Sequence, residues 1–203
     1  ELLMKLERQA AAAGGAVHVV LGNHEVMVMT GDLRYVSRAE FAAFADGETA
    51  AERETLYQSW LAEQPGQPEM TDQQARALFA DKFPPGYLGL QKAYAPDGAL
   101  GRWLLQKPLI IRVNDRVFMH GGASSAIVET SLEEINQKNK RDLNEYLRLV
   151  EKLRAEGILD RHVDFWERRQ HLNRKAEAVL AAEPDSRPGW FDDFVALAEL
   201  EGA

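Results

Sequence analysis

Ala16-Val17-His18-Val19-Val20-Leu21-Gly22-Asn23-His24-Glu25 is the stretch on which the interpretation of the fold depends. Its β-branched apolar run, 16–21, ends at a glycine and is typical of a short buried strand. A helical pattern at 2–13 precedes it, with several leucines and alanines on one face. A helix followed by a buried strand predicts an α/β arrangement.

A second apolar island lies at 109–119. The runs 109–113 and 117–119 flank Asn114-Asp115, a dipeptide favoured in tight turns, and this pattern predicts a β-hairpin. The second run leads into His120-Gly121-Gly122. Both islands therefore end in histidine and glycine, at the ends of strands, where open α/β sheets place their ligands.

The side chains at these two ends are candidate metal ligands. The amide oxygen of Asn23 and the imidazole of His120 both suit a divalent cation, and His24 could reach a substrate beside it. The neighbouring glycines allow the backbone to approach an ion or a phosphate. Taken singly, His120 is more often an ordinary core or loop histidine, and Gly22-Asn23 is an ordinary turn. The tetrapeptide 22–25, however, arises by chance in such a chain only on the order of once in a thousand.

The remainder of the chain reads as helix, in two segments at 37–106 and 125–203. Capping boxes begin helices at Ser37, Thr71 and Ser131, each followed three residues later by Glu or Gln. Breaks are predicted at 65–68, at 84–85 and at the turn 184–189. The helix that begins at Ser131 is expected to end at Gly157, and further helices are expected at 158–182 and 190–201.

Composition limits the classes of function. The chain has 203 residues, a net charge of −8, 45% apolar residues and no cysteine. It has no thiol nucleophile and no thiolate zinc site, and its acidity argues against a nucleic-acid partner. No apolar run approaches the ~18 residues of a membrane span, so we expect a soluble protein without a membrane partner, in the cytoplasm or the periplasm.

Two blocks of the sequence resemble a known family. The run 20–25 resembles the central motif of the calcineurin-like metallophosphoesterases, in their phosphoprotein phosphatase branch. Its continuation, 26–36, is similar to the Shewanella-like phosphatase subfamily. The segments 101–104, 107–108 and 117–124 are similar to the next block of that subfamily. The resemblance is strong in these blocks and weak in the helical remainder.

The resemblance implies a helix-rich α/β fold, part of an αββα metallophosphatase sandwich with extensive helical insertions. It also implies a metal-dependent phosphomonoester hydrolase with two divalent metal ions (Mn, Fe or Zn) and a bridging hydroxide that attacks phosphorus. Asn23 and His120 match metal ligands, and His24 matches the histidine that protonates the leaving-group oxygen. Glu25 would orient His24 or its loop. The expected substrate is a phosphoprotein or a small phosphomonoester.

Two arginines have less certain roles. Arg34 is a weak candidate for phosphate contact, because a guanidinium matches phosphate oxygens, and an ion pair with Asp32 is at least as good an explanation. The same alternatives hold for Arg102, with the structural role favoured. His162 and His171 lie in helical sequence without a neighbouring glycine and are not assigned to the site.

Several of the family's motifs are missing. Neither of its two opening aspartate motifs nor its closing Gly-His motif appears, and the chain starts at Glu1 inside a helical pattern. We therefore expect 1–203 to be a single metallophosphatase domain, incomplete at both ends. Two ligands cannot hold two closely spaced cations, so the chain itself should be inactive and bind one metal ion weakly.

Two alternatives remain open. The first is a non-catalytic helical interaction or scaffold protein that keeps a phosphatase-like loop. The second is a hydrolase of dinucleoside polyphosphates, which shares the central motif. A site requires Asn23 and His120 to converge on one crevice, whereas a scaffold protein does not.

Overall fold

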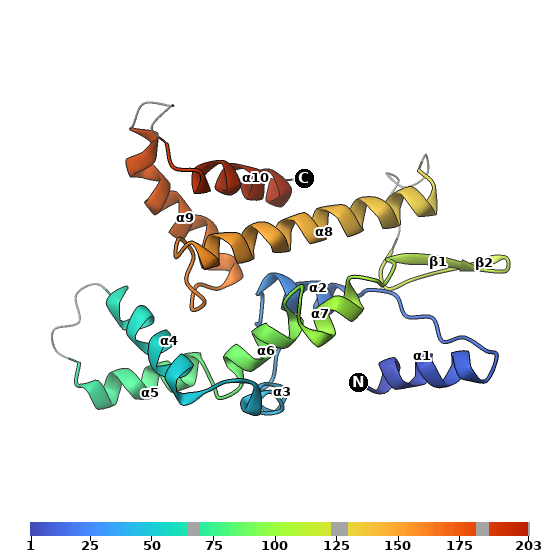
Figure 1. The fold of residues 1–203 in the computed structure, drawn as a ribbon, viewed down its shortest axis with the longest axis horizontal. Helices are drawn as coiled ribbons and strands as arrows, with labels where there is room; N and C mark the ends of the chain where they lie inside the picture. Colours follow the sequence, from blue (N-terminus) through green and yellow to red (C-terminus); the bar gives the residue numbers. More distant parts are fainter. Residues whose placement is uncertain (65–69, 123–129, 182–186, 203) are drawn as a thin grey trace.

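The computed structural model describes residues 1–64, 70–122, 130–181 and 187–202. Within them the chain is rich in helix, with one small sheet (Figure 1). The predicted break at 65–68, the first half of the predicted turn at 184–189 and the motif residues 123–124 lie outside these ranges. The elements are α1 (Leu2–Ala12), α2 (Asn23–Thr30), α3 (Arg38–Ala42), η1 (Ala45–Gly47), α4 (Ala50–Ala62), α5 (Asp72–Lys82), α6 (Tyr87–Tyr94), α7 (Ala99–Leu104), β1 (Ile110–Val113), β2 (Arg116–Met119), α8 (Leu132–Ala155), α9 (Phe165–Leu180) and α10 (Trp190–Gly202).

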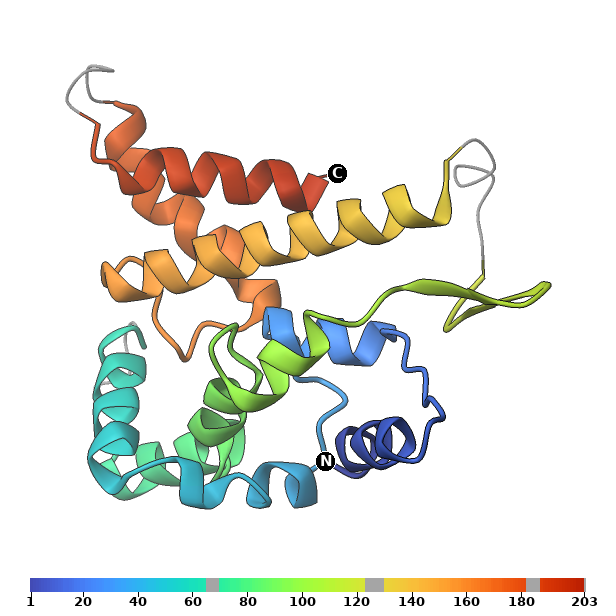
Figure 2. The same ribbon diagram turned by 45° about the vertical axis from the view of Figure 1, so that its right-hand side comes forward.

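Two hydrophobic clusters divide the helices. One cluster joins α3 to α6 and is largely aromatic, with Tyr57, Phe79 and Phe83 stacked in T-shaped or tilted contacts. The other is mainly aliphatic and centres on α8, α9 and α10; α8 and α10 lie side by side and α9 crosses them (Figure 2). Burying such side chains is the main favourable term in folding, so each cluster stabilises one group of helices.

Helix α2 lies between the two clusters. Met29 is buried in the aliphatic cluster and Val26 packs against it. Val28, on another face of the same helix, packs against the aromatic cluster. Because residues on different faces of α2 contact different clusters, this short helix is held in place from both sides.

The predicted hairpin is confirmed. Strands β1 and β2 pair antiparallel, with Ile110 opposite Met119 and Val113 opposite Arg116. Asn114 in the turn has φ of 56°, the left-handed conformation that asparagine tolerates. The amide side chain of Asn136 on α8 accepts from the backbone N–H groups of the residues at 109 and 110, at 2.9 and 3.2 Å, which fixes the hairpin against that helix.

The predicted strand at 16–21 is wrong. This segment belongs to no sheet, and its described link to the hairpin is a single hydrogen bond, from the Leu21 N–H to the Pro108 carbonyl at 2.9 Å. A β-strand is defined by a ladder of such bonds to a neighbouring strand. The β-branched residues at 16–21 favour a strand-like backbone, but they do not provide the neighbouring strand. The helix-rich α/β character is confirmed, while the described strands form one two-stranded sheet.

The local signals for helix ends are largely confirmed. Ser37, Thr71 and Ser131 each accept a hydrogen bond from the backbone N–H three residues later, as capping boxes require. Helix α8 ends just before Gly157, which has φ of 70°. The helix expected at 158–182 begins only at Phe165, because the Asp164 side chain caps the backbone at that point.

Helix α1 has no buried residue and is held by one polar contact. The Glu7 carboxylate accepts from the indole N–H of Trp103 at 2.6 Å and pairs with the Lys107 ammonium at 2.6 Å. This contact joins α1 to α7 and to the segment that leads into β1. As for membranes, no helix in the part of the chain that the structure describes is both long and apolar enough to cross a bilayer.

The start of α6 depends on a close backbone approach. Gly86 has φ of 91°, and a Cβ there would lie 1.7 Å from the Phe41 carbonyl oxygen. The buried Glu48 carboxylate accepts from the N–H groups of Gly86 and Leu88, both at 2.8 Å, and pairs with Arg53. This carboxylate satisfies backbone donors that the first turn of a helix leaves free.

We expect Gly86→Ala to lower the free energy of unfolding by about 3 kcal/mol or more. Left-handed backbone costs a side chain about 1–2 kcal/mol, and overpacking adds about 1–3 kcal/mol. Gly14→Ala is the matched control, because Gly14 has φ of 77° but nothing within 4 Å of the added Cβ. Urea denaturation of both variants measures the difference. Equal losses would contradict a role for the contact with Phe41.

Candidate functional site

The turn into α2 is built around Gly22. The Gly22 N–H donates to the Glu25 carboxylate at 3.0 Å, a capping interaction at the first turn of the helix. A Cβ at position 22 would lie 2.5 Å from Glu25 Oε2 and 3.1 Å from His120 Nδ1. A side chain there would therefore displace both residues, and glycine is what allows the His120 ring to pack against this turn.

Asn23 and His120 are brought together. Asn23 is the first residue of α2 and His120 directly follows β2, and their atoms Oδ1 and Nε2 are 3.0 Å apart. Both side chains are exposed. An octahedral cation with bonds of about 2.1 Å places neighbouring ligand atoms about 3 Å apart, so this spacing suits two ligands of one divalent ion. The convergence that a site requires is present.

The pair lies at the edge of a large cavity. The cavity has a volume of about 1190 Å³ and is bounded by α2, the hairpin and the helices α8 to α10. Most of its lining is apolar, including Leu21, Met27 and Ile135. Asn23 and His120 are thus polar groups at the rim of an apolar hollow, an arrangement that ligand sites commonly have.

His24 lies outside this cavity. Its ring stacks on Tyr35, with centroids 4.9 Å apart, and lines a separate hollow of about 200 Å³ together with Glu40 and Tyr94. Glu25 lines that hollow too, but its carboxylate bonds to the Gly22 N–H, so it orders the loop. Glu25 was expected to orient either His24 or the loop, and this hydrogen bond fits the second role.

Arg34 is engaged with Asp32. Its Nε and one terminal nitrogen each lie 2.9 Å from an Asp32 oxygen, a bidentate pair. The hydrogen bonds from Arg34 hold the pKa of the buried Asp32 carboxyl below its usual value. The guanidinium also lies over the Trp166 ring, 4.3 Å from its centroid. This geometry matches the structural alternative for Arg34. Arg102 is exposed and donates to the Asp97 carbonyl, again a local contact.

Sequence reasoning missed the residue that fixes the far end of α2. Arg168 on α9 is fully buried and donates to the Thr30 carbonyl at 2.7 Å and to the Tyr146 hydroxyl. Its partners lie 138 and 22 residues away in sequence, so no local pattern marks it. His162 and His171, which the sequence left unassigned, do not line the cavity beside Asn23.

The chain has a relative among proteins of known name. Over 146 residues it is 33% identical to Shewanella-like protein phosphatase 2 of Arabidopsis thaliana. The match takes in 70% of this chain and 37% of the relative, so the chain spans little more than a third of that protein's length. No family model matches the chain, and no solved structure matches it.

The relative carries the name of the subfamily that the blocks at 16–36 and 101–124 resemble. The short motifs and the similarity over most of the chain thus agree on one family. In its central portion, the chain belongs to the Shewanella-like phosphatases.

Proposed function

We propose that this chain is part of a metal-dependent phosphomonoester hydrolase, and that Asn23 and His120 are ligands of its metal centre. The observation that carries the proposal is the 3.0 Å separation of Asn23 Oδ1 and His120 Nε2. These atoms come from segments 97 residues apart and meet at the rim of a cavity of about 1190 Å³. The name of the relative, a protein phosphatase, supports the same reaction class.

The donor atoms of Asn23 and His120 can bind one divalent ion, but they are too few to bind two. Two adjacent cations repel each other strongly unless carboxylates or other anions lie between them. Among the described residues that line the cavity, Asp32 is paired with Arg34 and Glu201 accepts from the Tyr146 hydroxyl. We propose that the calcineurin-like sandwich of the complete protein supplies the remaining ligands, and that this chain alone binds one ion weakly.

Each residue then has a stated task. Asn23 and His120 would hold a metal ion through an amide oxygen and an imidazole nitrogen, which suit Mn²⁺, Fe²⁺ or Zn²⁺. The metal ions, when bound, supply the nucleophile and neutralise the phosphoryl oxygens. Gly22 and the carboxylate of Glu25 fix the turn that presents Asn23.

His24 is proposed as the proton donor to the leaving-group oxygen. It is exposed and follows Asn23 directly in the first turn of α2. Its backbone is therefore next to the proposed metal site, and only the orientation of its side chain keeps the ring away from it. To act there, the ring must leave Tyr35, on which it now stacks. Since exposed side chains change rotamer quickly, this movement is compatible with catalysis.

We propose phosphoproteins as the substrates, with small phosphomonoesters as the simpler alternative. The relative is named a protein phosphatase, which favours this class over dinucleoside polyphosphates. A helical scaffold protein would not need Asn23, Gly22 and His120 to fit one another so closely. That fit favours the catalytic interpretation.

Calorimetry with Mn²⁺ and an aryl phosphate assay test the proposal for this chain. We expect a weak Mn²⁺ site of millimolar rather than micromolar affinity, lost in Asn23→Ala and in His120→Ala, and no turnover. His18→Ala, a histidine outside the cavity, should leave Mn²⁺ binding unchanged. Micromolar binding of two ions that Asn23→Ala abolishes, or turnover that His24→Ala abolishes, would show that the chain holds a complete site. A Mn²⁺ binding isotherm that neither ligand substitution changes would overturn the assignment.

A second prediction concerns Arg34, whose structural role we favour. Asp32→Asn removes the charge that Arg34 binds and should lower the free energy of unfolding at pH 7 by about 1–2 kcal/mol. The pKa of Asp32 is lowered from 3.8 in the folded chain, so this contribution is present above 3.8 and is lost as the pH falls through the folded value. The difference between variant and wild type should therefore narrow below pH 3.8.

Urea denaturation at a series of pH values measures this difference. Asp115→Asn, a substitution in the exposed hairpin turn, is the control and should change stability by no more than about 0.5 kcal/mol. If Asp32→Asn matches wild type at pH 7, the ion pair does not stabilise the fold, and Arg34 becomes available for phosphate.

A further inference from the structure

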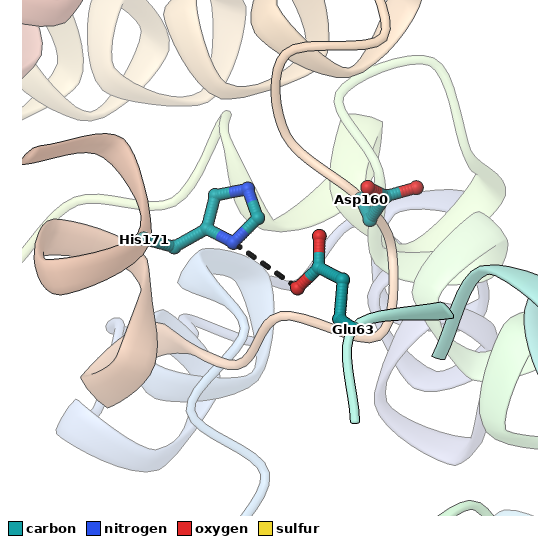
Figure 3. Close-up of side chains that lie close together, drawn as sticks. All are labelled: Glu63, Asp160 and His171. Atoms are coloured by element: carbon teal, nitrogen blue, oxygen red, sulfur yellow. Dashed lines mark ion pairs between the residues drawn. The ribbon is translucent and has the colours of Figure 1, made fainter. Parts of the chain in front are cut away.

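A second group of candidate ligands lies away from the Asn23–His120 pair. Glu63 directly follows α4, Asp160 and His162 lie in the connection between α8 and α9, and His171 lies on α9. Figure 3 shows the Glu63 carboxylate between the His171 ring and Asp160. One ligand atom from each of these three residues lies within 4.8 Å of the other two. His162 reaches the same carboxylate from another side.

The hydrogen bonds of His162 accommodate a proton on Nδ1. The Ser59 hydroxyl lies 3.1 Å from the Leu56 carbonyl and 3.2 Å from His162 Nδ1, and when it donates to the carbonyl its oxygen accepts from Nδ1. In the neutral ring, Nε2 then bears a lone pair. That lone pair faces Glu63 Oε2 at 3.2 Å.

His171 has a similar arrangement, but here Nε2 carries the proton and Nδ1 faces Glu63. Its Nε2 lies 3.3 Å from the Ile158 carbonyl, which can only accept, so Nε2 carries the proton. Nδ1 bears the lone pair and lies 3.4 Å from the same Glu63 oxygen. Burial lowers the pKa of His171, which favours this neutral ring.

In these tautomers the lone pairs of His162 Nε2 and His171 Nδ1 both face one oxygen of Glu63. Both histidine side chains are about 95% buried, with exposed fractions of 5% and 4%, whereas that of Glu63 is 34% exposed. Lone pairs that face a carboxylate at these distances repel it, and a cation placed between them would turn that repulsion into attraction. A histidine whose second nitrogen donates to a carbonyl or a hydroxyl is also the usual form of a metal-ligating histidine.

The spacing fits a small tetrahedral ion. With metal–ligand bonds of about 2.0–2.1 Å, the atoms of a tetrahedral zinc site lie about 3.3 Å apart. The two measured nitrogen–oxygen separations are 3.2 and 3.4 Å. The carboxylate of Asp160, within 4.8 Å, has to move by only about 1.5 Å to reach the same spacing.

We propose that Glu63, Asp160 and His171 bind one divalent cation of the zinc class, with His162, whose Nε2 lies 3.2 Å from Glu63 Oε2, as the fourth donor. The two carboxylates balance its charge, and the imidazoles supply neutral nitrogen donors. An adjoining cleft of about 470 Å³, which Glu63, His162 and His171 line, gives the ion a route from solvent. The ion would join the end of α4 to α9, and so would link the aromatic and aliphatic groups of helices.

Zinc and cobalt titrations of the tag-free chain at pH 7.5, after removal of metal with EDTA, test the proposal. The Asn23→Ala/His120→Ala variant is titrated in parallel, because it lacks the other pair of donors. We expect one Zn²⁺ per chain in both proteins and a higher midpoint of thermal unfolding when it is bound. The Co²⁺ complex should show the intense visible absorption of four-coordinate cobalt.

Matched substitutions locate the site. Glu63→Gln and His171→Gln keep size and hydrogen-bonding capacity and should weaken Zn²⁺ binding at least ~10-fold. Glu167→Gln is the control: Glu167 lines the same cleft but pairs with Lys82, and its loss should leave the affinity within about twofold. Circular dichroism checks that each variant is folded, and the cobalt spectrum of the unmodified chain decides the coordination number independently of any variant.

Four results would overturn the proposal. The first is no stoichiometric Zn²⁺ binding by the unmodified chain. The second is binding that survives both glutamine substitutions, and the third is binding that is lost with Asn23 and His120. The fourth is a melting temperature that does not respond to zinc, together with a proton held between the histidines and Glu63. The cluster would then bind a proton instead of a metal ion.

Discussion

The position of the candidate phosphatase site depends on one buried guanidinium. Arg168 lies wholly inside the protein and donates to the Thr30 carbonyl at the end of α2 and to the Tyr146 hydroxyl on α8. Burying a charged group is costly unless its donors are satisfied, so its position is strongly constrained. Three helices are thereby fixed with respect to one another.

Fixing one end of α2 determines where its other end lies. The helix is short, and its N-terminal residue is Asn23. With its C-terminus held by Arg168 and its sides packed against both hydrophobic clusters, Asn23 can only lie at the end of β2, beside His120. Apart from Asn23 at the start of α2, the described helices thus contribute to the site as a scaffold.

Local signals in the sequence predicted local structure well. A capping box depends on residues three positions apart, as at Ser131 and Glu134, and a hairpin turn depends on Asn114 and its neighbour. The strand expected at 16–21 failed because a ladder requires a partner, which a local pattern cannot supply. The helix expected from 158 began at 165 because the caps and turns of that connection outweighed its apolar spacing.

The candidate site was predictable only in part, for the same reason. Nothing in spacing alone relates Asn23 to His120, and only the resemblance to a family placed them together. Glu63 and His171 are 108 positions apart in the sequence, and their neighbours are ordinary helical residues. Arg168 has no distinguishing context either. Such groups become visible only when the fold brings distant segments into contact.

The segment before α2 places a site residue without the help of a sheet. Residues 16–20 belong to no described strand, and the Leu21 N–H, which donates to the Pro108 carbonyl, ties the segment to the approach of the hairpin. Gly22 and Asn23 follow directly along the chain, so this bond holds the start of α2 close to the end of the hairpin that carries His120.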